Sequence, residues 1–122
     1  SMHRSEEPLE VSLCNYQENL AESLAAAQTV LGPINSLKLE YTEFSQDDLT
    51  ALISCCPHLT RLELRDSNEL SDDVIEQTKW PQELQELDIQ NTSITARGLH
   101  AILQACPKLQ VLHVEACQNI SH

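Results

Sequence analysis

The sequence predicts an α/β solenoid in which short parallel strands line the concave side and helices cover the convex side. The first observation is a 25-residue repeat, whose units begin at positions 34, 59, 84 and 109. The second is that each unit carries apolar residues at its first, fourth and sixth positions: Ile34, Leu37 and Leu39; Leu59, Leu62 and Leu64; Leu84, Leu87 and Ile89; Leu109, Leu112 and Val114. Self-similarity at a fixed period of this size is typical of solenoids, in which neighbouring units share one core.

The third observation is a helix start signal in every unit. A hydrophobic residue is followed by a hydroxyl residue four times: Phe44 and Ser45, Leu70 and Ser71, Ile94 and Thr95, and Ile120 and Ser121. Such a hydroxyl can accept a hydrogen bond from a free amide of the first helical turn. Acidic residues follow at positions 47, 48, 72 and 73, where the helix dipole favours negative charge. Each unit is therefore predicted to contain a strand, a turn and a helix.

Each predicted helix buries one apolar face. The residues expected in this face are Leu49, Leu52, Ile53 and Cys56 in one unit, Val74 and Ile75 in the next, and Leu99, Ile102, Leu103 and Cys106 in the third. Prolines at positions 57, 81 and 107 are expected to end the helices, because the residue before a proline is disfavoured in a helix. The middle unit has few apolar residues after Ile75, so we expect a shorter helix there, with Trp80 filling the gap.

The chain of 122 residues is expected to form one domain with three parts. Residues 1–7 are polar and begin with a pair typical of tag removal, so we expect a disordered N-terminal tail with a tag scar. Residues 8–33 are interpreted as a degenerate first repeat or a cap, in which Ser12 rather than Val11 falls in the repeat frame. A helical pattern runs there from Leu20 to Leu31. Residues 34–122 are the repeats, and the last repeat, which ends before its helix, is interpreted as truncated.

The charge balance disfavours anionic partners. The chain holds 19 Asp and Glu against 7 Lys and Arg, which gives a formal net charge of -12. Such a surface repels phosphate groups, so we predict no nucleic acid and no membrane among its partners. No apolar run approaches the roughly 18 residues that a membrane helix needs. The five cysteines are an odd number, and three occupy core positions of the repeat, so we expect free thiols in a reducing compartment.

The junctions between units resemble a known family. The strings ACPKLQVLHVEACQNIS, from Ala105 to Ser121, and CCPHLTRLELRDSNELS, from Cys55 to Ser71, are similar to the cysteine-containing leucine-rich repeats, as in F-box leucine-rich-repeat proteins and Amn-like proteins. The resemblance covers about residue 34 to the end of the chain. The turn position that this family often fills with Cys or Asn is occupied here by Thr42, Ser67, Thr92 and Cys117, so only Cys117 is a full match.

The resemblance implies a leucine-rich-repeat solenoid that recognises another protein. In the F-box members of this family, the F-box binds the Skp adaptor of an SCF ubiquitin ligase and the repeats bind the substrate. No F-box pattern is visible in this sequence, so the Skp adaptor and the cullin are expected to bind through a region outside this chain. The resemblance implies no cofactor and a cytoplasmic or nuclear protein. The alternative is a structural or assembly factor of a larger complex, mitochondrial and without a ubiquitin link, resembling coupling factor B of the ATP synthase.

The candidate binding site is the concave face of the predicted sheet. Side chains alternate along a strand, so three positions of each unit point away from the core. In register, these positions form three columns: Ser36, Arg61, Glu86 and Val111; Lys38, Glu63, Asp88 and His113; and Glu40, Arg65, Gln90 and Glu115. We predict that a protein partner binds to Lys38, Arg61, Glu63, Arg65, Glu86, Asp88, His113 and Glu115.

The same residues could instead hold the sheet together. The lateral pairs of opposite charge are Lys38 with Glu63, Arg61 with Glu86, and Glu40 with Arg65, and such pairs stabilise a sheet by about 0.2–1 kcal/mol. The like-charged Glu63 and Asp88 do not fit this interpretation, and we expect Asp88 to be the charged partner of His113. The sequence leaves both interpretations of this face open.

Neither the cysteines nor the paired acidic residues require a metal or a catalytic site. Cys55, Cys56, His58 and Cys106 offer soft ligands for zinc. However, Cys56 and Cys106 lie two repeats apart at an apolar helix position, where a buried cysteine acts as a small hydrophobe. We therefore predict no metal, and expect Cys55, facing away from the core, to be the most readily oxidised thiol. Capping and the helix dipole explain the paired aspartates, and we predict no enzymatic activity.

Overall fold

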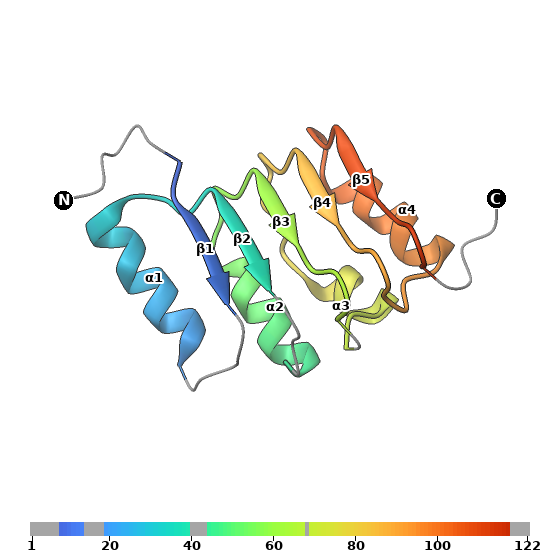
Figure 1. Ribbon diagram of the computed structural model, residues 1–122, viewed down its shortest axis with the longest axis horizontal. Coiled ribbons are helices and arrows are strands. Elements are labelled where there is room, and N and C mark those ends of the chain that lie inside the picture. Colours follow the sequence, from blue (N-terminus) through green and yellow to red (C-terminus); the bar gives the residue numbers. More distant parts are fainter. Residues whose placement is uncertain (1–7, 14–18, 40–43, 68, 118–122) are drawn as a thin grey trace.

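The computed structural model describes residues 8–13, 19–39, 44–67 and 69–117. In this part of the chain, five short strands form one parallel sheet in the order β1-β2-β3-β4-β5 (Figure 1). The strands are β1 (Glu10–Leu13), β2 (Ser36–Leu39), β3 (Arg61–Glu63), β4 (Glu86–Asp88) and β5 (Val111–His113). The helices between them are α1 (Leu20–Leu31), α2 (Gln46–Ser54), α3 (Asp72–Gln77) and α4 (Ala96–Ala105).

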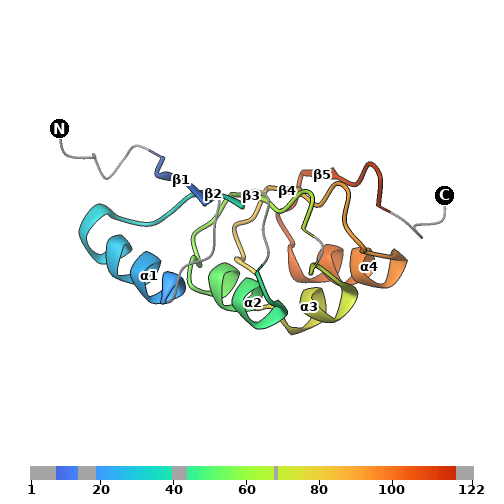
Figure 2. The same ribbon diagram turned by 60° about the horizontal axis from the view of Figure 1, so that its bottom comes forward.

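The strands and helices form two layers. Figure 2 shows α1 to α4 together on one side of the sheet, and no described helix lies on the other side. Parallel strands need a crossover connection, and each described connection here contains one helix. The predicted α/β class with short parallel strands is confirmed. We call the side of the sheet without described helices the open face.

The strands pair in the register that the repeat predicts. From β2 to β5, each strand residue lies opposite the residue at the same position of the next unit, as in the row Leu37, Leu62, Leu87 and Leu112. β1 differs, because its pairing with β2 is shifted by a single position and places Val11 opposite Leu37. The repeat frame would have placed the polar Ser12 there. The shift restores the apolar alternation of the first strand.

The hydrophobic core lies between the sheet and the helices. The apolar strand positions of three units are at most 1% exposed: Ile34, Leu37, Leu39, Leu59, Leu62, Leu64, Leu84, Leu87 and Ile89. In the last unit, Leu109, Leu112 and Val114 are only partly buried, because no further described unit packs on them. Burying one such side chain contributes about 1.5–3 kcal/mol, so this ladder of stacked side chains is the main source of stability.

The helices α2, α3 and α4 begin at the predicted hydroxyl residues. The capping contacts join Ser45 Oγ to Asp48 N (3.1 Å), Ser71 Oγ to Val74 N (3.4 Å), and Thr95 Oγ1 to Arg97 N (3.3 Å). In each case the hydroxyl oxygen accepts from an amide of the first helical turn, and the hydrophobic residue before it is buried. These three start signals are confirmed. The fourth, Ile120 with Ser121, lies outside the described residues.

The middle helix is shorter than its neighbours, as predicted. α3 has six residues and ends at Gln77, ahead of the proline at position 81. Trp80 then folds back into the core, where it is 5% exposed. Its indole Nε1 donates a hydrogen bond to Ile75 O at 2.9 Å, so burial leaves no unsatisfied donor on the ring. The prediction that Trp80 fills the space left by a short helix is confirmed.

A left-handed residue follows each of the last three strands. Asp66, Asn91 and Ala116 have φ angles of 64°, 56° and 58° and occupy the same position of successive units. The side chains of Asn91 and Asp66 are joined by a hydrogen bond of 2.8 Å from Nδ2 to Oδ1. Aspartate and asparagine tolerate this conformation better than other side chains with a Cβ atom. The same turn therefore repeats along the edge of the sheet, and after β3 and β4 it directs the chain toward the following helix.

Two leucines at helical spacing are exposed, and one of them, Leu103, was predicted to be buried. Leu103 is 56% exposed and Leu31 is 41% exposed. The buried face of α4 is centred on Ile102, and the next residue of a helix is rotated by about 100°, so Leu103 points outward. Leu31 is the last residue of α1, one turn beyond the point where Gln28 contacts the end of α2. The prediction for Leu103 is wrong because helical spacing does not show where the neighbouring elements pack.

The Asp72 carboxylate joins α3 to α4. Its Oδ1 accepts a hydrogen bond from Thr95 N at 2.9 Å, and its Oδ2 accepts one from Thr95 Oγ1. A side chain of one helix thus accepts hydrogen bonds from the backbone amide and the hydroxyl of the residue that starts the next helix. Gly98 is buried against this contact, and a Cβ atom at this position would collide with Asp72 Oδ1. The close approach of the two helices therefore depends on the missing side chain.

This contact predicts that Gly98→Ala destabilises the protein, although alanine is favoured over glycine inside a helix by about 1 kcal/mol. The added methyl group displaces the Asp72 carboxylate, and each hydrogen-bonding group left unsatisfied by burial costs about 1–3 kcal/mol. Denaturant unfolding measures the change in the free energy of unfolding. The matched control is Asp72→Ala/Gly98→Ala compared with Asp72→Ala, where the alanine at position 98 should be neutral or stabilising. A stabilising effect of Gly98→Ala in the original chain would contradict the collision.

Exposure predicts different effects at two adjacent positions of α4. Ile102→Ala should lower the free energy of unfolding by about 2–5 kcal/mol, because it removes part of a fully buried side chain. Leu103→Ala should change it by less than about 1 kcal/mol, since the side chain lies largely in water. Urea unfolding of both variants under the same conditions tests the difference. Equal losses would mean that Leu103 belongs to the core.

Candidate functional site

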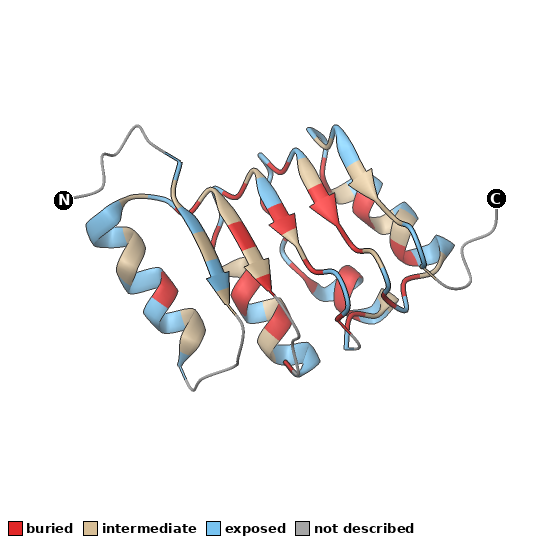
Figure 3. Cartoon of the chain, in the orientation of Figure 1, coloured by how far each residue is buried: buried red, intermediate tan, exposed pale blue. Residues whose placement is uncertain are grey.

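The open face is formed by every second residue of the strands. In β2, Leu37 and Leu39 are buried, whereas Ser36 and Lys38 are half-buried, and Figure 3 shows this alternation in the colours along the strand. This alternation follows from the pleat of a strand. The strand register confirms two of the predicted columns: Ser36, Arg61, Glu86 and Val111, and Lys38, Glu63, Asp88 and His113. In the third column, Glu40 lies outside the described residues.

Two of the predicted lateral ion pairs are present on this face. Lys38 Nζ lies 3.3 Å from Glu63 Oε2, and Arg61 Nε lies 3.6 Å from Glu86 Oε2. The side chains of Lys38 and Arg61 are 44% and 53% exposed, so water screens both cations. Exposed ion pairs contribute about 0–1 kcal/mol, which is small beside the buried leucines of the same strands. These pairs are therefore not the main force that holds the strands together.

The expected pair of Asp88 and His113 is not formed. His113 Nε2 instead lies 3.1 Å from Glu86 Oε2, the same oxygen that faces Arg61. The Asp88 carboxylate accepts hydrogen bonds from the backbone N and the side-chain Nε2 of Gln90, at 3.0 and 3.1 Å. A short aspartate is satisfied by its own turn, whereas the longer glutamate reaches the diagonal position of the next strand. The expectation for Asp88 is therefore wrong.

Two further contacts complete the charged surface. Arg65 Nε lies 3.9 Å from Asp88 Oδ2, and the Arg65 side chain is 46% exposed. Glu63 has a side chain that is only 12% exposed, and its Oε2 makes no hydrogen bond within the described part of the chain. The Lys38 ammonium compensates its charge without completing its hydrogen bonding. A buried carboxylate oxygen requires such a nearby cation, because burial disfavours an isolated charge.

Seven of the eight residues predicted for the site form three groups of polar contacts: Lys38 with Glu63, Arg61 and His113 with Glu86, and Arg65 with Asp88. The eighth, Glu115, is exposed beyond the end of β5, and its backbone oxygen accepts a hydrogen bond from Asn91 N. The cations belong to β2, β3 and the turn after β3, whereas two of the carboxylates belong to β4. The open face therefore carries both signs of charge side by side.

The thiols are distributed as buried and half-buried groups. Cys56 and Cys106 are 0% and 2% exposed at the predicted core position, and burial raises the pKa of the Cys106 thiol to about 11. Cys117 is half-buried, with Sγ donating to Ile89 O at 3.0 Å. Within the described residues, no group of three or more His, Cys, Asp or Glu side chains is arranged to hold a metal ion. Cys55 is half-buried as well, so its predicted outward orientation is only partly correct.

Sequence reasoning missed the role of Gln28. Its Nε2 donates a hydrogen bond to Cys55 O at 2.9 Å, and its Oε1 accepts one from Ile34 N at 3.2 Å. One side chain of α1 thereby ties the end of α2 to the start of the β2 segment. Gln28 lies in the irregular first unit, where the repeat frame gives no aligned position, so the repeat carries no signal for it.

Comparison with known proteins relates the chain to F-box proteins. It is 29% identical over 91 residues to the F-box protein SKIP19 of Arabidopsis thaliana, which covers 73% of this chain and 30% of that protein. It is also 29% identical over 107 residues to the F-box/LRR-repeat protein 23 of the same plant, covering 82% of this chain and 24% of that protein. The chain thus spans less than a third of the length of these relatives. No family model matches the chain.

No described helix combines the length and the apolar character that crossing a membrane requires. The chain is distantly similar to F-box proteins, and the open face of its sheet is charged.

The exposure of the ion pairs predicts that they are dispensable for folding. Arg61→Gln and Glu86→Gln should each lower the free energy of unfolding by less than about 1 kcal/mol, because water screens the pair. Chemical denaturation measures both variants, and Leu62→Ala, from the buried side of the same strand, is the matched control with an expected loss of about 2–5 kcal/mol. A loss above about 2 kcal/mol for either glutamine variant would assign the pair a structural role.

Proposed function

We propose that this chain is a protein–protein interaction module of the leucine-rich-repeat type. In this proposal it forms the substrate-recognition repeats of an F-box-type receptor of an SCF ubiquitin ligase. The observation that carries the proposal is the similarity to two F-box proteins over 73% and 82% of the chain. The pairing of each strand with the same position of the next unit supports the repeat architecture, in which each unit adds one strand and one helix to a solenoid.

The open face is the proposed substrate-binding surface. Its side chains project from a sheet whose other side is packed against helices, so the backbone positions that carry them are fixed before a partner arrives. Such preorganisation lowers the entropy that is lost on binding. A partner segment that carries both acidic and basic groups would exchange the ion pairs of Arg61 and Arg65 for contacts across the interface.

The Skp adaptor and the cullin would not bind to the repeats of this chain. In an F-box receptor, the F-box recruits the Skp adaptor, and the repeats position the substrate at a distance from it. We therefore propose that Skp and cullin are recruited through a region outside these residues, and that the protein acts in the cytoplasm or nucleus. On this proposal the repeats contribute no catalytic group, because the ligase complex supplies the transfer chemistry.

Charge reversal on the open face tests this proposal. The full-length protein is captured from cells and its partners are identified by mass spectrometry, beside Arg61→Glu/Arg65→Glu. We expect Skp and cullin with both forms, and at least a tenfold loss of the substrate protein from the variant, equivalent to about 1.4 kcal/mol.

The matched control for this experiment is Arg97→Glu/Lys108→Glu, which reverses two exposed cations that pair with Asp73, Glu76 and Glu83 away from the open face. It should retain all partners, and circular dichroism should show that both double variants are folded. Capture of a stable complex without Skp or cullin would favour the assembly-factor alternative. Substrate retained by Arg61→Glu/Arg65→Glu would remove the open face from the proposal.

A further inference from the structure

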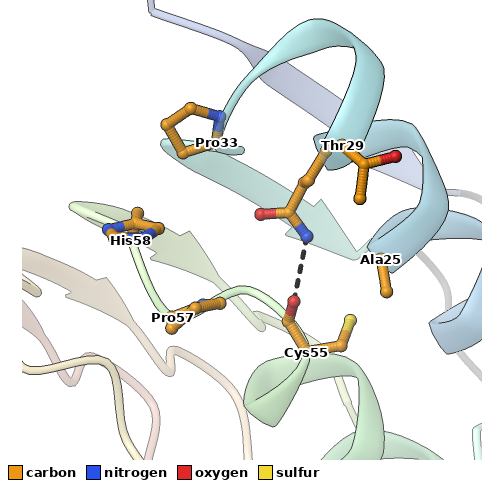
Figure 4. Close-up of a pocket in the computed structure, with 7 residues that line it drawn as sticks. Ala25, Thr29, Pro33, Cys55, Pro57 and His58 are labelled. Carbon is orange, nitrogen blue, oxygen red and sulfur yellow. Dashed lines mark hydrogen bonds between the residues drawn. The ribbon is translucent and has the colours of Figure 1, made fainter.

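A groove lies on the helical side of the molecule, between α1 and the segment that follows α2. Its volume is about 340 Å³, and it is lined by Ala25, Gln28, Thr29, Pro33, Cys55, Pro57 and His58. Figure 4 shows the side chain of Cys55 pointing toward Ala25 of α1, with Pro33 and His58 at the other end. Because Cys55 lines this groove, a small molecule can reach its sulfur without unfolding the chain. None of these residues belongs to the proposed binding surface on the open face.

A second thiol lies directly behind the first. Cys55 Sγ and Cys56 Sγ are 3.6 Å apart, and Cys56 is 0% exposed. The two sulfurs are therefore in contact, one at the groove and one in the core. This arrangement separates the two roles in thiol oxidation, because the accessible sulfur meets the oxidant and the protected sulfur can react only with its neighbour.

The contact between the two sulfurs also sets their protonation. A hydrogen bond from the Cys56 thiol lowers the pKa of Cys55, and the same hydrogen bond raises the pKa of Cys56. Burial of Cys55 acts in the opposite direction, but the hydrogen bond from Cys56 is the larger influence on the pKa of Cys55. While it is protonated, Cys55 Sγ donates to Leu52 O at 3.1 Å. The thiolate is the nucleophilic form of cysteine, so the groove-facing sulfur is the more reactive of the two.

We propose that Cys55 and Cys56 form a redox modification site for small hydroperoxides, in which Cys55 is the attacked thiol and Cys56 is the resolving thiol. The Cys55 thiol first releases its proton, and the thiolate attacks the terminal peroxide oxygen. An S–O bond forms, the O–O bond breaks, and the departing alkoxide or hydroxide takes up the proton that Cys55 released. Cys56 sulfur then attacks the Cys55 sulfenic acid, the S–S bond forms, and the departing hydroxide takes the Cys56 proton as water. Two thiols lose two electrons, which reduce the hydroperoxide to an alcohol or to water.

The product is a disulfide between adjacent residues, which is expected to be reversible. Adjacent Cα atoms are about 3.8 Å apart, closer than the usual minimum of about 4.4 Å for a disulfide, so the bond forms under strain and thiols reduce it readily. The Cys55 carbonyl is held by Gln28 Nε2 at 2.9 Å, so a change of backbone at this point acts directly on the joint between α1 and α2. The site therefore couples oxidation to the attachment of the first helix. This inference does not depend on the proposed function.

Cys106 provides an internal comparison within the same protein. It occupies the equivalent helix position two repeats later, is 2% exposed, and is preceded by Ala105 instead of a second cysteine. Burial raises the pKa of Cys106 to about 11, and no thiol neighbour opposes this effect in the described part of the chain. The proposal therefore predicts reaction at the pair and protection at Cys106, although both sites lie at the end of a helix before a proline.

Peroxide treatment followed by mass spectrometry tests the proposal. The reduced protein is exposed to one equivalent of hydrogen peroxide, alkylated, and cut after Lys38 and Arg61, which releases residues 39–61 with Cys55 and Cys56 as the cysteines in that peptide. We expect this peptide to lose the mass of two hydrogen atoms and to escape alkylation, at a rate at least about tenfold above the oxidation of Cys106. Dithiothreitol should restore the original mass.

Two alanine variants separate the roles of the two thiols. Cys56→Ala should stop disulfide formation and leave a sulfenic acid at Cys55 that dimedone traps, whereas Cys55→Ala should leave Cys56 unmodified in the folded protein. Cys106→Ala is the matched control and should oxidise at the pair like the original chain. Oxidation of Cys55 no faster than Cys106 in the original chain, or a disulfide from Cys55 to any residue except Cys56, would overturn the proposal. The oxidation rates of Cys55 and Cys106 in the original chain test the proposal even if an alanine variant fails to fold.

Discussion

The structure depends on one constraint, the in-register stacking of apolar side chains along five parallel strands. A strand of three or four residues cannot bury enough surface to be stable alone. Leucines at one position of each unit pack on the same position of the next unit, so each unit helps to bury the core of its neighbour. The shifted pairing of β1 shows the strength of this constraint, because the chain departs from the repeat frame to keep its apolar side inward.

The same constraint produces the open face. If every second residue must be buried, the residues between them must project to the other side, and the register then arranges them in columns. Opposite charges at neighbouring positions lower the repulsion that a net charge of -12 would otherwise concentrate on this surface. Because exposed pairs are weak, the surface is compatible both with an unbound sheet and with exchange of its pairs for those of a partner. The hydrophobic ladder makes the sheet rigid, and in the proposed function the charged columns would select the partner.

The irregular units show how local departures from the repeat are accommodated. The short α3 leaves a space that Trp80 occupies, and the glycine at position 98 lets Asp72 reach the start of α4. In the first unit, Gln28 ties α1 to the end of α2. In each case a side chain outside the repeated pattern satisfies polar groups or fills volume where the pattern is incomplete. The groove that exposes Cys55 lies at one of these irregular junctions.

The sequence by itself determined the α/β class, the strand register from β2 to β5, the three described helix starts and the packing of Trp80. Those features follow from local chemistry and a fixed period, both of which can be read along the chain. The tertiary structure decided which residues meet across units. His113 contacts Glu86 instead of Asp88, Leu103 faces outward, and Cys55 touches Cys56 beside a groove. These outcomes depend on side-chain length, on helix rotation and on the neighbouring elements, which a one-dimensional pattern does not contain.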